Sequence, residues 1–260
     1  MILLYLGRPA EKPPPPVPQG ISIPVAPLEM KAVAVIIDDF GHSRPAARPF
    51  LEMEYPVAMS FLPGRPFTRE LAAEARAMGK TLLLHLPMEP EGYPAKDPGP
   101  GAILLSHGRR EIHRILEEDL STVPGVVGVN NHMGSRATAD ERVMEAVLDE
   151  IRNRGFFFID SRTSPQTLGF VIATRMGIRT AERDVFLDND PDPAAIDARV
   201  DELLDLAEKR GWAIGIGHAH PLTAEALERM AVKARQRGIQ WISLESLIAY
   251  VDPGNRNVVR

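Results

Sequence analysis

One pattern recurs along this sequence and limits the folds that it can adopt: a helical segment ends in glycine, and a short apolar run follows directly. The four glycines are Gly79, Gly155, Gly211 and Gly238. Each suits the left-handed position that closes a helix. The runs that follow are continuously apolar rather than alternating, which is typical of strands buried on both faces of a parallel sheet. The chain is therefore expected to alternate helices and strands.

Further apolar runs at residues 32–38, 56–62, 126–130 and 184–187 bring the expected strands to about eight. The sequence also predicts a helix start, because Thr138 followed by Glu141 indicates a capping box. About 230 residues of such alternation fit one α/β domain. A parallel (β/α) barrel is the first expectation and a doubly wound sheet is the second.

The two ends of the chain are expected to lie outside this domain. Eight of the 24 prolines fall in residues 1–28 without helical or alternating periodicity, so residues 1–30 are expected to form an extended linker. The apolar residues 1–6 fit either the remnant of an export signal or membrane anchor, or a disordered tail. No apolar stretch approaches the roughly 18 to 20 residues that cross a bilayer, so no membrane span is expected. Residues 253–260 are interpreted as a tail.

Charge and cysteine content exclude several functions. The 30 Lys and Arg residues against 35 Asp and Glu residues give a net charge of −5, and no basic run is longer than two residues. Because nucleic-acid binding needs a basic face, this balance argues against it. The chain has no cysteine, which excludes thiol nucleophiles, disulfides and cysteine-based metal sites.

Polar side chains gather where the predicted strands end. They are Asp38 and Asp39, His85, Asn130 to His132, Asp160 to Arg162, and His218 with His220. In parallel α/β barrels the carboxyl ends of the strands build the active site. The sequence therefore predicts an active site at this edge.

Asp38 and Asp39 follow a wholly apolar strand, where two adjacent carboxylates are costly unless they share a cation or one is protonated. This favours one metal ligand and one general base over the alternatives, a helix cap or an ion pair with arginine. His85 lies in an equally apolar run and is interpreted as a ligand rather than a core histidine. Carboxylates combined with imidazoles favour zinc, iron or manganese over magnesium.

The segment from Gly215 to His220 places small residues ahead of two histidines. Small residues at a strand end let another group approach closely. The pair His218 and His220 can supply two metal ligands, or one proton-transfer group and one supporting residue. The alternative is a tight turn in which the histidines are incidental.

Together these segments resemble a known family, the divergent branch of the polysaccharide deacetylases, over about residues 31–250. Asp-Asp-Phe-Gly at 38–41 is similar to the superfamily motif T-F-D-D-G, and His85 matches the first histidine of H-x-x-x-H. Gly-His at 217–218 matches the final L-x-H motif, and Asn-His-Met-Gly-Ser at 131–135 completes the signature.

The resemblance implies an irregular (β/α) barrel of about seven parallel strands over residues 31–252. It implies that Asp38 is the general base and that Asp39 and His85 bind the metal. It also implies that His218 is the general acid.

Two positions depart from the family pattern. Glu89 stands where the second metal-binding histidine would be, and Asn130 stands where an arginine normally braces the base. The third ligand is therefore His132, our first choice, or Glu89. Arg136 and Arg162 are candidates to replace the missing brace.

Further candidates belong to the surroundings of the site. Those for an additional ligand or a supporting position around the metal are Glu89, His220, Asp160 and Arg162, and those for substrate binding are Asn131 and Ser135.

The resemblance further implies hydrolysis of an acetyl group on a glycan with one divalent metal, zinc above others. It implies a periplasmic or cell-envelope protein whose partner is peptidoglycan or another envelope polysaccharide. Two alternatives stay open: a glycan-binding or envelope-organising barrel without turnover, and a metal hydrolase that acts on another bond such as a phosphoester.

Overall fold

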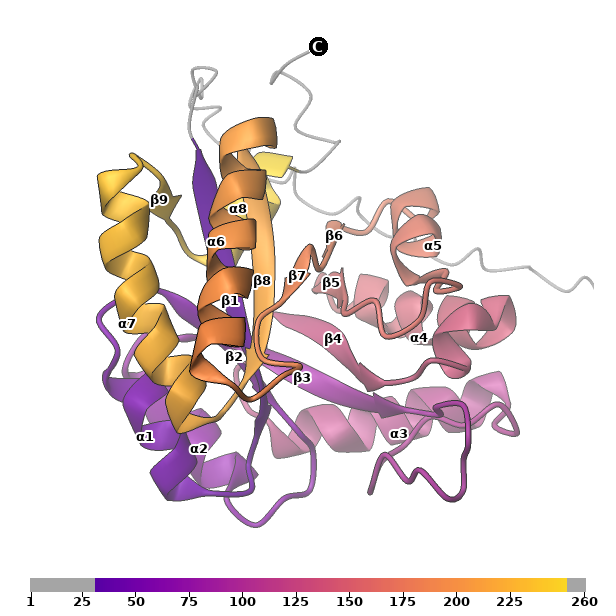
Figure 1. Ribbon diagram of the computed structural model, residues 1–260. Coiled ribbons are helices and arrows are strands. Elements are labelled where there is room, and N and C mark those ends of the chain that lie inside the picture. Colours follow the sequence, from indigo (N-terminus) through magenta and orange to yellow (C-terminus); the bar gives the residue numbers. More distant parts are fainter. Residues whose placement is uncertain (1–30, 252–260) are drawn as a thin grey trace, which may run out of the picture.

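The computed structural model describes residues 31–251, and the predictions for residues 1–30 and 253–260 fall outside them. The helices are α1 (Arg44–Glu52), α2 (Thr68–Ala77), α3 (Arg109–Thr122), η1 (Ala137–Ala139, a 3₁₀ turn), α4 (Glu141–Asn153), α5 (Gly169–Arg175), α6 (Pro193–Arg210), α7 (Pro221–Gln236) and α8 (Leu244–Val251). The strands are β1 (Ala32–Phe40), β2 (Val57–Phe61), β3 (Thr81–Met88), β4 (Gly128–Met133), β5 (Phe157–Asp160), β6 (Thr180–Glu182), β7 (Val185–Phe186), β8 (Trp212–His218) and β9 (Gln240–Trp241). Figure 1 shows their arrangement.

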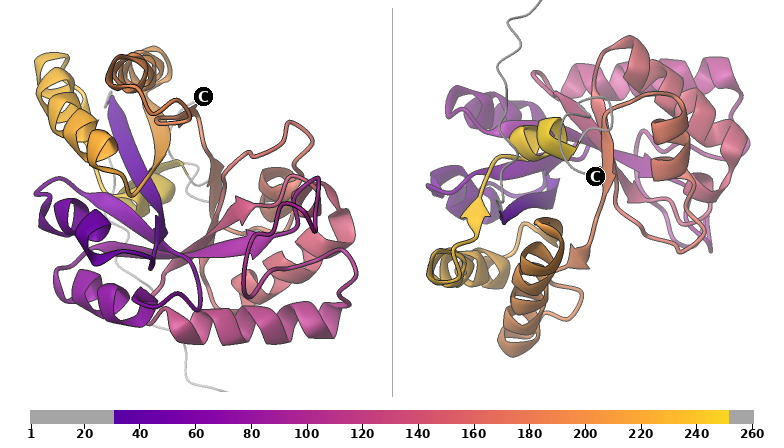
Figure 2. Two further views of the ribbon diagram at one scale, coloured as in Figure 1. Left: turned by 60° about the horizontal axis from the view of Figure 1, so that its bottom comes forward. Right: turned by 90° about the horizontal axis from the view of Figure 1, so that it is seen from above.

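The strands form one curved parallel sheet in the order β6-β5-β4-β3-β2-β1-β8-β7, and β9 also pairs with β1. The edge strands β6 and β7 are neighbours in sequence, yet within the described residues they do not pair with each other. The sheet therefore curls into a barrel that stays open on one side, with helices around its outside (Figure 2). This confirms the predicted irregular parallel barrel and not the doubly wound sheet.

Strand β1 is buried on both faces, as its continuous apolar run predicts. Val33, Val35 and Ile37 pack in the large core cluster that includes the surrounding helices. The alternate residues Ala34 and Ile36 pack in a second cluster on the inner side of the sheet. Successive side chains on a strand point to opposite faces, so one strand serves both cores.

Helix α8 fills the amino-terminal end of the barrel interior. Its residues Leu244, Leu247 and Ile248 are buried in the inner cluster with Ala32 at the start of β1. This apolar plug leaves the opposite end, where the strands finish, for polar side chains.

Two local predictions differ from the structure. Helix α4 is capped by Asp140, which accepts a hydrogen bond from the Val143 amide, while Thr138 belongs to the preceding 3₁₀ turn. The predicted capping box is therefore wrong by two residues. Strand β6 was not expected, because its three residues lack an apolar run. No helix among residues 31–251 is long and apolar enough to cross a membrane.

Candidate active site

An irregularity at the end of β1 brings both aspartates into one site. Pairing with β2 shifts register between Ile37 and Phe40, as in a β-bulge. Asp39 at the irregularity has φ +66°, in the left-handed region that non-glycine residues rarely adopt. Bulges of this kind re-aim side chains beside active sites. Two adjacent residues of one strand, Asp38 and Asp39, can therefore both line the same pocket.

The same conformation recurs at two other strand ends. Met133 follows His132 with φ +52°, and Arg162 follows Ser161 with φ +49°. These two and Asp39 are the only non-glycine residues with positive φ in the described part of the chain. Each lies in or directly beside the pocket lining. Such backbone strain persists where the surrounding structure imposes it, and it is common at functional sites.

The structure brings Asp39, His85 and His132 together. His85 Nε2 lies 3.3 Å from Asp39 Oδ1, and His132 Nδ1 lies 3.1 Å from the same oxygen. The two ring nitrogens are 3.1 Å apart. These three side chains come from β1, β3 and β4, and His132 is the register partner of Pro87, two residues after His85.

This geometry fits a metal ion. Bonds of about 2.0 to 2.1 Å in a tetrahedral arrangement hold ligand atoms about 3.3 Å apart. Asp39 Oδ1 is buried and accepts no hydrogen bond from the described residues. A buried carboxylate oxygen without a donor is costly, and a cation held by the two imidazoles would compensate it. One carboxylate and two imidazoles are a donor set typical of zinc and related transition metals.

The pKa shifts of Asp39 and His85 reflect their mutual attraction, whereas that of His132 reflects burial. Burial would raise the pKa of Asp39, but contacts with His132 and His85 hold it well below the usual range. Burial would lower the pKa of His85, yet the charges of Asp38 and Asp39 raise it. At His132 burial dominates and the pKa of the ring is lowered. A cation is therefore favoured beside these carboxylates.

Asp38 lies beside the cluster and is more deeply buried than Asp39. Its side chain is 3% exposed, and Oδ2 lies 3.6 Å from His85 Nε2. Asn130 donates a hydrogen bond of 2.9 Å to the other oxygen. Burial raises the pKa of Asp38, although His85 and the hydrogen bond from Asn130 oppose that shift. The candidate brace is therefore the neutral amide of Asn130 rather than an arginine.

His218 lies opposite Asp38, because the two are register partners on β8 and β1. Its Nδ1 donates to Asp188 Oδ1 at 3.0 Å, and its Nε2 lies 3.9 Å from Asp39 Oδ2. Asp188 also accepts hydrogen bonds from the His218 backbone amide and from Thr223. Burial would lower the pKa of His218, but Asp188 raises it to about 9.

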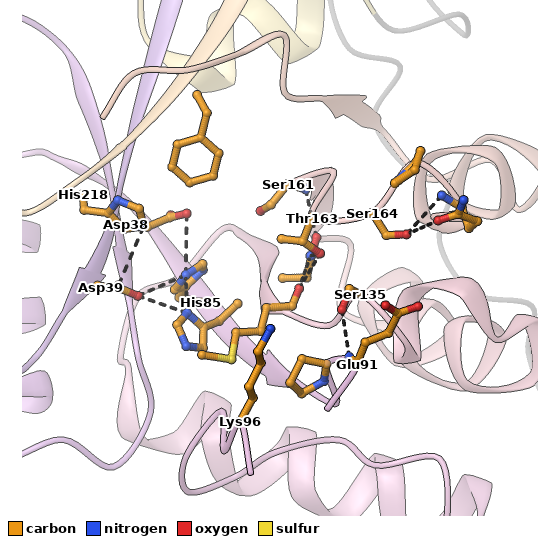
Figure 3. A pocket seen from close by; sticks show the side chains of 17 residues that line it. Asp38, Asp39, His85, Glu91, Lys96, Ser135, Ser161, Thr163, Ser164 and His218 are labelled. Carbon is orange, nitrogen blue, oxygen red and sulfur yellow. Dashed lines mark hydrogen bonds and ion pairs between the residues drawn. The ribbon is translucent and has the colours of Figure 1, made fainter. Parts of the chain in front are cut away.

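One end of a pocket of about 620 Å³ is lined by Asp38, Asp39, His85, His132 and His218 (Figure 3). Ser161, Thr163 and Ser164 lie across the cavity from His85, and Lys96 extends toward its centre. The predicted substrate residues Asn131 and Ser135 also line the pocket. The Asn131 side chain donates a hydrogen bond to the Met133 carbonyl and accepts one from the Ser161 backbone N–H. It therefore also links the ends of β4 and β5.

Five other predicted residues lie outside the cluster. Glu89 accepts hydrogen bonds from the Leu105 backbone N–H and from the Arg136 guanidinium. Glu89 and Arg136 therefore pair with each other. Arg162 pairs with Glu182 rather than with Asp38. The remaining two bind the starts of helices: Asp160 accepts a hydrogen bond from the Phe170 N–H in the first turn of α5, and His220 is the N-cap of α7 and accepts one from the Leu222 N–H. None of these five belongs to the group that could hold a metal.

Asp188 is the residue that sequence reasoning missed. The segment that contains it resembles a capped turn before a helix, and Asp192 does cap α6. However, Asp188 also follows the apolar strand residues 185–187, the same signal that identified the other site residues. Applied consistently, that signal would have found it.

Comparisons with known proteins support a common ancestry. The family model described as divergent polysaccharide deacetylase matches residues 35–248. The uncharacterized protein YibQ of Escherichia coli is 34% identical over 206 residues, which are 79% of this chain and 64% of that protein. The chain thus spans less than two thirds of that relative's length.

Solved structures of other proteins share the fold of this chain. An uncharacterized protein of Agrobacterium tumefaciens matches with a TM-score of 0.81 and 28% identity, over 86% of this chain and 92% of that one. Two more distant structures share the fold. The catalytic domain of a peptidoglycan N-acetylglucosamine deacetylase from Eubacterium rectale has a TM-score of 0.53 and 12% identity, over 82% and 88% of the two chains. A CE4 family pseudoenzyme from Bacillus anthracis has a TM-score of 0.51 and 15% identity, over 86% and 70%.

The family match covers most of the chain and includes every strand that supplies a residue to the cluster. This chain belongs to the divergent polysaccharide deacetylase family.

Proposed function

We propose that this protein is a metal-dependent hydrolase that removes acetyl groups from an envelope polysaccharide such as peptidoglycan. One observation supports this most directly: the oxygen of Asp39 and the ring nitrogens of His85 and His132 converge within 3.3 Å of one another at the end of a polar pocket. The proposed base and acid, Asp38 and His218, lie beside this cluster: Asp38 is 3.6 Å from His85 and His218 is 3.9 Å from Asp39.

The metal that we propose is zinc, held by Asp39, His85 and His132. A divalent ion in such a site supplies Lewis acidity, which polarises an acyl oxygen and lowers the pKa of water from 15.7 toward about 7. Three protein ligands leave a fourth position open, as in catalytic rather than structural zinc sites.

Asp38 is proposed as the general base. Its carboxylate is buried, and Asn130 holds Oδ1 at 2.9 Å. Burial raises the pKa of Asp38 toward the operating pH, which strengthens it as a base. It would take the proton of the water that attacks the acyl carbon.

His218 is proposed as the general acid. Asp188 fixes its Nδ1, so Nε2 faces the pocket and the ring is protonated at neutral pH because its pKa is raised to about 9. The Nε2 proton would pass to the leaving amine or alkoxide of the sugar. The proposed acid and base thus lie on the neighbouring strands β8 and β1, where they are register partners.

The pocket and the family support a sugar polymer as substrate. The pocket wall carries the hydroxyl groups of Ser135, Ser161, Thr163 and Ser164, which can form hydrogen bonds with sugar hydroxyls. A substrate of this kind would place the protein in the periplasm or cell envelope, which is part of the proposal.

The test measures metal content and acetate release on protein purified without an affinity tag. We expect close to one zinc per chain and acetate release from acetylated peptidoglycan fragments. Asp39→Ala and His85→Ala should lose both, whereas His218→Ala should keep the metal and lose about 100-fold or more in kcat. His220→Ala, two residues away but at a helix cap, is the matched control and should keep both.

The main alternative is a glycan-binding barrel without turnover, which the shared fold of the Bacillus anthracis pseudoenzyme makes a specific competitor. Glycan binding with no acetate release from the zinc-loaded protein would support it. Absence of any metal after reconstitution would contradict the hydrolase.

A further inference from the structure

Asn130 occupies the centre of the buried polar network below the pocket. It is fully buried on β4 and is the register partner of His85 on β3. Its Nδ2 donates to Asp38 Oδ1 at 2.9 Å and to Ser161 Oγ at 3.3 Å. Its Oδ1 accepts from Ser60 Oγ at 2.5 Å and from His85 Nδ1 at 3.0 Å. One side chain therefore contacts both the base and a metal ligand.

The two contacts require opposite hydrogen-bonding roles. A carboxylate only accepts, so the group facing Asp38 must donate, and the carbonyl that faces His85 can only accept. An amide offers both edges in one plane. An arginine in this position could donate to Asp38 but could not accept from His85, because a guanidinium has no acceptor.

We propose that Asn130 is a positioning residue that couples the two halves of the site: it orients Asp38 and fixes the tautomer and orientation of His85. With the Nδ1 proton held by Asn130, the lone pair of His85 lies on Nε2, which faces Asp39 Oδ1 and His132 Nδ1. Such partners of metal-binding histidines set the ring tautomer and raise ligand basicity. The roles of Asp38 and His85 rest on the proposed function; the hydrogen-bond network does not.

Two substitutions separate the two edges of the amide. Asn130→Leu removes both edges, so we expect zinc affinity to fall by about 10- to 100-fold. Asn130→Asp keeps an acceptor for His85 but turns a carboxylate toward Asp38. It should bind zinc at least as tightly as the wild type and lose about 100-fold or more in kcat. Zinc dissociation constants are measured by titration calorimetry and kcat on acetylated peptidoglycan fragments.

Ser60→Ala is the control for disturbing the same network. It removes one donor to Asn130 Oδ1 and leaves the contacts with Asp38 and His85 in place. Zinc affinity should change by less than about threefold.

The tautomer is measured separately by nitrogen NMR of metal-free, histidine-labelled protein at a pH where the ring of His85 is neutral. We expect protonated Nδ1 in the wild type and in Asn130→Asp, and a shift toward protonated Nε2 in Asn130→Leu. If Asn130→Leu fails to fold, Asn130→Asp decides: unchanged kcat, or zinc affinity weakened tenfold, would overturn the proposal. Wild-type tautomer and zinc affinity in a folded Asn130→Leu would overturn it too. A wild type that binds no zinc would refute the proposed function, while the metal-free NMR comparison would still decide the role of Asn130.

Discussion

Asp188 and Asp119 are both nearly buried, yet their surroundings shift their pKa values in opposite directions. Burial would raise the pKa of Asp188, but hydrogen bonds from His218 and Thr223 lower it. Asp119 has a buried Oδ2 without any hydrogen-bond partner in the described residues, and burial raises its pKa to about 8. The first carboxylate supports a neighbouring cation, and the second prefers to be neutral.

Asp188→Asn should therefore weaken His218 as the proposed general acid. Without the negative charge the pKa of His218 falls, so the alkaline limb of kcat/KM should move to lower pH. We expect kcat to fall by about tenfold or more, because the acid is less often protonated and less well oriented. Zinc content should not change, since Asp188 contacts none of the three proposed ligands. The pH profile of kcat/KM checks this, with the exposed Asp190→Asn as control. An unshifted alkaline limb would contradict it.

Asp119 should make the fold less stable as pH rises. Its pKa is 3.8 in the unfolded chain and about 8 in the folded protein, so between these values the folded state holds a proton that the unfolded state has lost. Stability from this group is complete below about pH 4 and decreases as pH rises to about 8, by at most about 1.4 kcal/mol per pH unit.

Urea unfolding between pH 5 and pH 8 tests this expectation (about one to four units above the unfolded pKa). Relative to the wild type, Asp119→Asn should show a flatter loss of unfolding free energy with pH. Glu118→Gln, the exposed neighbour, should keep most of the wild-type slope, because its charge is a smaller cause of the shift than burial. Equal slopes for Asp119→Asn and the wild type would refute the assignment.

At the scale of single residues, the sequence located the candidate cluster but left two residues open for its third position, because that choice depends on side-chain direction. Glu89 and His132 were both plausible third ligands from their positions. Only His132 reaches Asp39, because Glu89 turns to Leu105 and Arg136. Such a difference depends on loop geometry and is invisible in residue spacing.

Elements were easier to predict when their burial was uniform. The long apolar strands β1, β3 and β8 lie where they were expected. Strand β6, with the sequence Thr-Ala-Glu, has no such signal, because tertiary pairing with β5 rather than local propensity makes it a strand. The bulge in β1 was equally hidden, although it determines where Asp39 points.

Helix α5 depends on a carboxylate that the sequence placed among the metal candidates. Asp160 Oδ2 accepts from the Phe170 amide and from Thr167 Oγ1, while Oδ1 accepts from the Arg162 amide. Asp160→Ala should lower the free energy of unfolding by about 1 to 3 kcal/mol, because buried donors lose their acceptor. Zinc content per folded chain should stay at the wild-type level.

Urea denaturation and metal analysis of the same samples check both parts of that expectation. Glu182→Gln breaks the half-exposed ion pair with Arg162 and should cost less than about 1 kcal/mol. Loss of zinc from folded Asp160→Ala would show that Asp160 supports the metal site, as the sequence left open.

On the scale of the whole molecule, the proposed ligands connect β1 with β3 and β4 across an open, curved sheet. Because the proposed zinc would bind only the folded arrangement of Asp39, His85 and His132, it should stabilise the entire domain. A hundredfold excess over Kd adds about 2.7 kcal/mol, which raises Tm by about 5 to 10 °C for a domain of this size. Calorimetric scans with zinc or with a chelator check this. The control His220→Ala should show the full shift. Asp39→Ala should show none, and an equal shift in that variant would mean that zinc stabilises the protein from another site.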